Sequence, residues 1–253
     1  MSDHHFWLSE AQFARLQPLL PNKPRGVPRV DDRRVISGIV HVIRGGLMWR
    51  DAPAVYGPPK TLYNRFVRWS RIGVFDRIFA TLAGESAATD TVTIDATHLK
   101  AHRTAASLRK KGLFPRRIGR TKGGLNSKLH AVCDREGKPL ILLLTEGQVS
   151  DYRGAATVLP NLPEADRLIA DKGYDSDWFR EALTDLEITP CIPGRANRKA
   201  PIPYDTELYK QRNRIERMFG RLKDWRRIAT RYDRCAHTFM SAICIAATVI
   251  FWL

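Results

Sequence analysis

Hydrophobic residues recur at helical spacing in three segments near the amino terminus. A capping-box pair, Ser9 and Gln12, begins the first segment, and a proline at position 21 ends it. The second runs from Asp32 to two glycines at 45 and 46, and the third runs from Pro59 to about Arg71. The pattern therefore predicts a small all-helical domain over residues 1–88. Its inward positions are Phe13, Leu16 and Leu20, then Val35, Ile36, Ile39, Val40 and Ile43, then Leu62, Phe66 and Trp69.

Residues 83–90 lack apolar periodicity and predict a linker, and the pattern changes after it. Three apolar runs with tight connections come first, and strands then alternate with helices. This order predicts an α/β domain over residues 89–253, in which helices flank a mixed sheet. The predicted strands are 91–96, 127–134, 139–145, 167–171 and 188–192, and the predicted helices are 151–159, 176–186 and a long one from about Thr206.

The apolar carboxyl-terminal run and the cysteines bear on the compartment. Residues 236–253 contain no Asp, Glu, Lys or Arg and are almost long enough to cross a bilayer. The run lacks a basic flank and contains hydroxyls and His237, which favours a core helix laid against a sheet over a membrane span. Four cysteines lie far apart without a Cys-x-x-Cys pair, which favours a reduced, cytoplasmic setting.

The net charge of the chain indicates the kind of partner that it attracts. The chain has 42 Lys and Arg against 26 Asp and Glu, a formal net charge of +16, so its field attracts polyanions. Residues 97–128 contain no acid, and we expect a basic loop at about 100–127 that contacts DNA through Arg116, Arg117, Arg120 and Lys122. The basic residues of the segment are Lys100, Arg103, Arg109, Lys110, Lys111, Arg116, Arg117, Arg120, Lys122 and Lys128.

Three carboxylates carry the candidate chemistry. Asp95 follows the β-branched run Val-Thr-Ile and Asp171 follows Arg-Leu-Ile-Ala, so each is expected at the carboxyl end of a buried strand. Glu216 lies on the predicted long helix, where the steps between positions 209, 212, 216 and 223 place Tyr209, Arg212, Glu216 and Lys223 along one stripe. An all-oxygen cluster favours a hard cation such as Mg²⁺. Taken separately, each acid also has an ordinary structural explanation as a turn former or a helical ion pair.

The order Asp, Asp, Glu with the stripe Tyr-x₂-Arg-x₃-Glu-x₆-Lys resembles the DDE transposases of bacterial insertion sequences. The stretches Thr-Ile-Asp-Ala-Thr-His, Gly-Gly-Leu-Asn-Ser-Lys-Leu-His-Ala-Val and Ala-Asp-Lys-Gly-Tyr-Asp-Ser resemble the insertion-sequence-five family in particular. The resemblance covers about residues 90–253. It implies that the α/β domain is ribonuclease-H-like and that Asp95, Asp171 and Glu216 are the catalytic, metal-binding residues.

The resemblance also implies an activity and its partners. Two Mg²⁺ ions, with Mn²⁺ able to substitute, would serve strand cleavage by hydrolysis and then attack of the freed 3′-hydroxyl on target DNA. The partners would be double-stranded DNA, as terminal inverted repeats and as target, and further copies of the protein in a homodimer or higher oligomer. We expect Arg212 and Lys223 to contact phosphates, Tyr209 to orient the stripe and His98 to contact a phosphate or hydroxyl. The protein would act in a bacterial cytoplasm, at the nucleoid, without a membrane.

The amino-terminal helices are expected to read DNA. On the helix from Pro59 to Arg71, the positions Lys60, Asn64, Arg65 and Arg68 point outward from the apolar stripe, which resembles a helix-turn-helix reader. The connection from residue 46 to residue 58 is longer than that motif usually has, so a plain helical scaffold stays open. Two other functions stay open as well: a catalytically silent DNA-binding repressor, and a ribonuclease-H-like nuclease without strand transfer.

Overall fold

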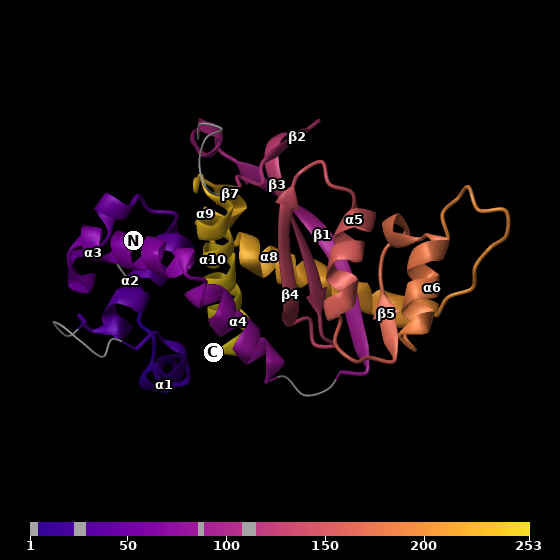
Figure 1. Ribbon diagram of the computed structural model, residues 1–253, viewed down its shortest axis with the longest axis horizontal. Coiled ribbons are helices and arrows are strands. Elements are labelled where there is room, and N and C mark those ends of the chain that lie inside the picture. Colours follow the sequence, from indigo (N-terminus) through magenta and orange to yellow (C-terminus); the bar gives the residue numbers. More distant parts are fainter. Residues whose placement is uncertain (1–4, 23–28, 86–88, 108–114) are drawn as a thin grey trace. The chain divides into compact units, whose positions relative to one another are not determined.

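The computed structural model describes residues 5–22, 29–85, 89–107 and 115–253. The chain forms two compact units (Figure 1). Unit 1 comprises Met1–Leu82, Ala101–Arg116 and Leu222–Leu253, and unit 2 comprises Ala83–Lys100 and Arg117–Arg221. The predicted boundary at residue 88 differs from this arrangement. It assigns the carboxyl-terminal residues to the domain that contains the sheet, whereas Leu222–Leu253 belong to unit 1.

Unit 1 is built on the amino-terminal helices that the apolar pattern predicts. Ser9 and Gln12 form the capping box of the first helix, and Gly46 ends the second with a φ of 69°. The third helix has the predicted bounds. A fourth helix was not predicted; it follows the third after a turn and buries its apolar residues. The four helices are α1 Glu10–Leu16, α2 Asp32–Gly45, α3 Pro59–Arg71 and α4 Val74–Gly84.

The carboxyl-terminal run completes unit 1. It forms α10 Ala236–Ala247, which is buried on nearly all sides and continues as a π-helical turn, Thr248–Trp252. The predicted core location is confirmed, but α10 packs against α2, α3 and α9 rather than against a sheet. In the described part of the chain, no helix is long and apolar enough to cross a membrane. The preceding elements are α9 Arg226–Ala229 and β7 Thr230–Arg231.

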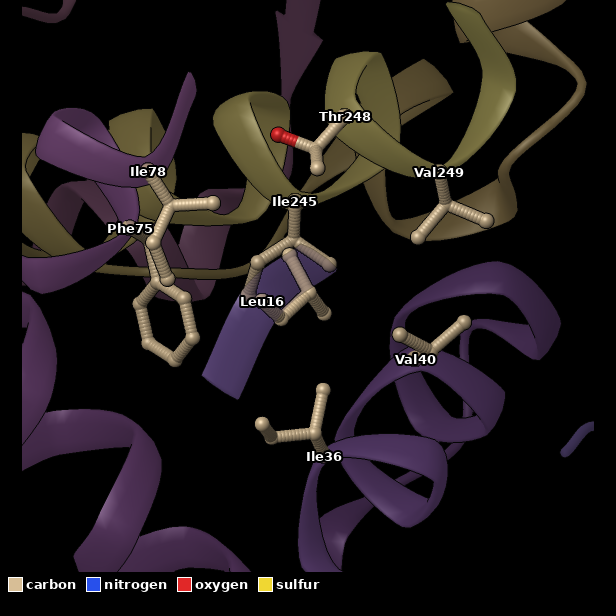
Figure 2. Close-up of a pocket in the computed structure, with 8 residues that line it drawn as sticks. All are labelled: Leu16, Ile36, Val40, Phe75, Ile78, Ile245, Thr248 and Val249. Carbon is tan, nitrogen blue, oxygen red and sulfur yellow. The ribbon is translucent and has the colours of Figure 1, made fainter. Parts of the chain in front are cut away.

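A small apolar cavity lies where α10 and its π-helical turn meet the amino-terminal helices. Its volume is about 20 Å³, and its walls are almost wholly apolar (Figure 2). This is room for about one water, but a water there would lack the polar partners that it needs. The lining residues are Leu16, Ile36, Val40, Phe75, Ile78, Ile245, Thr248 and Val249.

Unit 2 contains a mixed sheet of the predicted kind. Its strands follow the order β2-β3-β1-β5-β6, and β4 also pairs with β3. The early strands are antiparallel to one another, whereas β1, β5 and β6 run parallel. The strands are β1 Thr91–Ala101, β2 Gly119–Thr121, β3 Gly124–Cys133, β4 Pro139–Glu146, β5 Arg167–Ile169 and β6 Thr189–Cys191.

Helices cover the sheet of unit 2. Helix α5 (Asp151–Val158) and helix α6 (Asp177–Asp185) pack apolar residues onto β1, β3 and β5, including Ala155 and Phe179. Helix α8 (Asn213–Lys223) passes behind the strands in the view of Figure 1. It follows α7 (Thr206–Tyr209). Short 3-10 turns occur at Gln17–Leu19, Trp49–Asp51, Ala54–Tyr56, Arg103–Ser107, Leu159–Asn161, Lys172–Tyr174 and Lys210–Arg212.

Candidate active site

Asp95 and Asp171 lie at matching positions relative to two neighbouring parallel strands, and Asp171 follows the end of β5. The pairing of β1 with β5 ends at Thr93 opposite Ile169, and each aspartate follows two residues later. Parallel strands end at the same edge of a sheet, so both carboxylates emerge beside the end of β5. Strand β1 itself continues to Ala101 along β3, so the prediction that Asp95 ends its strand is wrong in this detail.

The carboxylate of Asp95 is largely buried, with 15% of its side chain exposed. Oδ1 accepts a hydrogen bond of 2.7 Å from the N–H of Ala96, and Oδ2 accepts one of 2.8 Å from Nη1 of Arg212. Burial raises the pKa of Asp95 to about 6; the Ala96 hydrogen bond and the Arg212 charge oppose this rise, and the charges of Asp171 and Asp151 add to it. A cation bound beside this buried acid would favour its ionised form.

Asp171 begins a short turn that is fixed from two sides. Its Oδ1 accepts a hydrogen bond of 2.7 Å from the N–H of Gly173. Arg195 donates to the carbonyl oxygens of Lys172 at 3.2 Å and Gly173 at 2.7 Å, and its own N–H donates to Asp175 at 2.7 Å. The loop that contains Arg195 therefore positions the Asp171 turn, a role that the sequence reasoning missed.

The segment that bears Glu216 is not one continuous helix. A 3-10 turn over Lys210–Arg212 separates α7 from α8, so the predicted long helix from Thr206 is interrupted. Leu208 on α7 packs with Ile169 of β5 and with β6, and half-buried Tyr209 packs against the same cluster. This packing anchors the segment at the carboxyl end of β5, beside the aspartates.

Arg212 links two of the three acids. Its guanidinium donates to Asp95 and also contacts the carboxylate of Glu216 four residues later. Burial would lower the pKa of Arg212, but the charges of Asp95 and Glu216 together raise it. Lys223 lies two turns after Glu216 on the same helix, half-buried, and burial lowers its pKa. The stripe thus brings the guanidinium of Arg212 beside two of the carboxylates.

Comparison with known protein families identifies the class of protein to which this chain belongs. The family described as "Transposase DDE domain" matches residues 87–251, and the family described as "Putative transposase of IS4/5 family" matches residues 8–79. The chain belongs to the DDE transposase family. The predicted resemblance is therefore confirmed, and the protein is a DNA transposase, an enzyme of metal-dependent phosphoryl transfer.

Two relatives support the assignment of this transposase. The protein is 36% identical over 130 residues to the "Putative transposase for insertion sequence element IS6501" of Brucella ovis, a match that covers 51% of this chain and 99% of the relative. It is 30% identical over 169 residues to the "Putative transposase for insertion sequence element IS402" of Burkholderia cepacia, covering 59% and 78% of the two chains.

The fold is similar to that of a solved transposase. The comparison with the piggyBac transposase, solved as a synaptic complex with hairpin DNA, gives a TM-score of 0.50 at 11% identity and covers 94% of this chain and 69% of that one. The ribonuclease-H-like sheet with flanking helices and an amino-terminal helical region was correctly predicted.

DDE transposases use divalent metal ions, and the residues of this transposase fit such ions in part. Asp95 and Asp171 are oxygen donors of the type that a hard cation prefers. Glu216 is 53% exposed and its carboxylate is bound by Arg212. Within the described ranges, no group of three or more His, Cys, Asp or Glu side chains is arranged to hold a metal ion. The Glu216 carboxylate is thus paired with Arg212 rather than grouped with the two aspartates.

The predicted basic loop contains short strands where the transposase is described. Strand β1 extends to residue 101, and β2 pairs with the start of β3. Arg120 and Lys122 are exposed on this ribbon, whereas Arg117 forms an ion pair of 3.3 Å with Glu146 and Arg116 donates to the carbonyl of Ala106. Glu146, which pairs with Arg117, lies on β4 and so outside residues 97–128, and the lack of acids within that segment did not indicate this ion pair. Residues 108–114 of the segment lie outside the described residues.

Two further predicted DNA contacts have different outcomes. His98 is exposed on β1, where its Nδ1 lies 3.2 Å from the side-chain oxygen of Asn126. Arg65 does not face outward on α3: it is 6% exposed, forms an ion pair with Asp32 and lies 4.8 Å from the Trp69 ring centroid. The prediction that Arg65 meets DNA bases is wrong, because these partners bury its charge. Lys60, Asn64 and Arg68 are exposed on α3, as predicted.

Proposed function

We propose that this transposase binds the terminal inverted repeats of its own insertion sequence, cleaves the DNA strands there and joins the freed 3′-hydroxyl ends to target DNA. The observation that carries this proposal is the placement of Asp95 and Asp171 two residues beyond the last β1–β5 pair, with Glu216 joined to Asp95 through Arg212. We place this action on nucleoid DNA in a bacterial cytoplasm.

Asp95, Asp171 and Glu216 would hold two divalent cations, Mg²⁺ or Mn²⁺ in its place. When bound, these cations activate the attacking oxygen and stabilise the leaving oxygen at a phosphate. The chain's own residues supply the rest of the chemistry. Arg212 holds the negative charge of Asp95 and Glu216 in balance until DNA binds, and Arg212 and Lys223 would then contact phosphates. Tyr209 is fixed by packing and would keep Arg212 in place.

Contacts to DNA away from the three acids would come from exposed basic and polar side chains in each unit. Lys60, Asn64 and Arg68 on α3 and Arg120 and Lys122 on the β2–β3 ribbon are the candidates, with His98 beside the ribbon. Contacts to phosphate make binding strongly dependent on salt. Two or more copies of the protein would hold the paired ends of the element, since each end needs its own active site.

The test uses the full chain, a duplex carrying the terminal repeat, Mg²⁺ and a target plasmid. Wild-type protein should give cleaved ends and joined products. Asp95→Asn, Asp171→Asn and Glu216→Gln should each lose both products while binding the repeat with wild-type affinity, because the protein keeps its basic surface. Glu181→Gln, an exposed acid on α6, is the matched control and should retain full activity.

The products separate the alternatives. Cleavage without joining would identify a nuclease, and repeat binding without cleavage would identify a repressor. Cleavage surviving at more than a few per cent in any of the three variants contradicts the assignment of the acids. Arg68→Ala should weaken binding to repeat and random DNA alike. Unchanged binding would show that Arg68 of α3 does not contact DNA.

A further inference from the structure

Two exposed aromatic side chains touch each other on the surface of unit 2. Tyr152 of α5 is 41% exposed and Trp178 of α6 is 37% exposed, and their ring centroids are 5.0 Å apart. Exposed apolar residues that are scattered singly are ordinary on protein surfaces and need no explanation. Two large rings in contact, both left partly in water, form a continuous aromatic surface that folding alone does not require. We call these two residues the aromatic pair.

The core of unit 2 holds the aromatic pair in place. The ring of Trp178 lies nearly parallel to that of Phe179, with centroids 5.8 Å apart and an interplanar angle of 24°. Phe179 is 1% exposed and belongs to the same apolar cluster as Ala155 of α5. The indole is therefore supported from the core side, and its exposed part faces solvent. Rings that are already fixed lose little conformational entropy when they bind a partner.

The two helices that carry the aromatic pair start beside the turn that follows Asp171. A side-chain carbon placed on Gly173 of this turn would lie 3.6 Å from Oδ2 of Asp151. Tyr152 follows Asp151 directly on α5. On its other side the turn leads into α6, where Trp178 is the second residue. The aromatic pair is thus carried by elements that flank the proposed active site.

Charge and chemistry around the aromatic pair favour a DNA ligand. Arg153 on α5 and Lys172 in the turn are both exposed, whereas the acid before Trp178, Asp177, forms an ion pair with Arg198. Proteins that bind single-stranded DNA combine such cations, which contact phosphates, with rings on which bases stack. Bases inside a duplex are already stacked on one another. An unpaired base, by contrast, offers its face to a protein ring.

We propose that Tyr152 and Trp178 stack on an unpaired base of the DNA strand held at the proposed active site. Unpairing a base is costly, and stacking on the aromatic pair offsets that cost. The inference rests on the proposed function for the position of the strand, whereas the binding of an unpaired base can be measured without any reaction. A second copy of the chain is the other possible occupant of this surface, and the test separates the two.

The test compares two DNA duplexes with the full chain in EDTA, so that no strand is cleaved. Both carry the same short single-stranded extension, but in one of them the extension is abasic and offers phosphates without bases. Wild type should bind the duplex with bases about tenfold more tightly, the effect expected from stacking one base. Trp178→Leu keeps an apolar side chain over Phe179 but has no ring, so it should lose this preference and bind the abasic duplex with the wild-type Kd. Trp178→Phe should keep most of the preference.

Trp7→Leu is the matched control on unit 1. Trp7 is 42% exposed and also packs against another ring, that of Tyr56, so its replacement should leave the preference intact. Equal binding of both duplexes by wild type, or a preference retained in Trp178→Leu, would overturn the inference. A lower molecular mass of Trp178→Leu in sedimentation, with the preference retained, would overturn it in favour of a contact between copies.

A second variant keeps the inference testable if Trp178→Leu does not fold. Tyr152→Leu should then weaken the preference for the duplex with bases, and a preference equal to that of wild type would count against the aromatic pair. The proposed function fails by a different result, namely cleavage by Asp95→Asn in Mg²⁺. Loss of the base preference in Trp178→Leu would still stand in that case, because it is measured without divalent cations.

Discussion

Asp175 shows that a buried acid near the active site can be structural. It is 2% exposed and receives hydrogen bonds from the side chains of Arg180 and Arg198 and from the N–H of Arg195. Burial alone would raise the pKa of Asp175, but these donors outweigh it and hold the pKa well below the ordinary value of 3.8. The network attaches the loop containing Arg195 and Arg198 to the start of α6.

We predict that Asp175→Asn lowers the free energy of unfolding by about 3 kcal/mol at neutral pH, because it leaves buried guanidinium groups without their counter-charge. The folded pKa lies below the unfolded one, so the contribution of Asp175 is present above about pH 4 and is lost as the pH falls below that value. Denaturant unfolding at pH 7 and pH 2.5 measures it. A difference between wild type and variant that does not shrink in acid would contradict the assignment.

Residue-level prediction from the sequence succeeded where the chemistry was local. Asp95 and Asp171 each follow the paired part of a strand, and Glu216 lies one helical turn after Arg212, so the spacing placed these residues correctly. Their catalytic role stays a prediction. Residue-level prediction failed for Arg65, whose partner Asp32 lies 33 positions away.

Glycines on two helices of unit 2 illustrate packing at the scale of elements. Gly154 on α5 lies against His130 of β3, and a side-chain carbon at position 154 would come within 2.1 Å of the Nδ1 of that histidine. Among the described residues, nothing outside its own stretch of helix lies within 4 Å of a side-chain carbon placed on Gly220 of α8. His130 is buried, and burial first and Lys128 second lower its pKa to about 4, so it packs as a neutral ring.

We predict opposite effects of alanine at these two positions. Gly220→Ala should raise stability by up to about 1 kcal/mol, because alanine favours the helix interior. Gly154→Ala gains the same propensity but must displace His130 from a packed interior, so it should lower stability by about 1 to 3 kcal/mol. Thermal unfolding of both variants is the measurement. A rise in Tm for Gly154→Ala would mean that α5 does not rest on His130.

Element prediction was accurate for helices with clear ends and weaker elsewhere. The bounds of α3 follow from a proline at its start, and those of α2 follow from glycine at its end. Helix α4 was missed because it follows α3 after a turn and its start carries no cap that the sequence displays. The 3-10 turn before α8 could not be predicted, since Lys210, Gln211 and Arg212 all favour ordinary helix.

Unit 1 joins parts of the chain that are far apart in sequence. Arg227 of α9 donates to the carbonyl of Leu47 at 3.0 Å, and a side-chain carbon on Gly46 would come within 2.7 Å of Arg226. Phe239 of α10 is fully buried, with Arg231 lying 4.8 Å from its ring centroid. No local pattern in residues 1–88 reveals this packing, because the apolar stripes show that each helix has an inner face but not what covers it.

We predict that a protein ending after residue 234 cannot keep the amino-terminal helices folded. Loss of α10 would uncover the apolar faces of α2 and α3 that pack against it. Hydrogen exchange should show that backbone amides at 35–43 lose protection in the truncated protein. As a control, Ile72→Ala, which shortens an exposed side chain, should leave that protection intact. Protected amides in the truncated protein would show that the amino-terminal helices form a stable domain without α10.

Unit 1 combines residues from both ends of the chain, so it can be completed only late in synthesis. Helices α2 and α3 emerge from the ribosome well before residues 236–247 have been translated, so they wait without the helix that covers them. The proposed DNA surface on α3 is then completed only after the entire sheet of unit 2 has been made. Under the proposed function, a nascent or prematurely terminated chain would not bind the terminal repeats, so every molecule that binds them would already contain Asp95, Asp171 and Glu216.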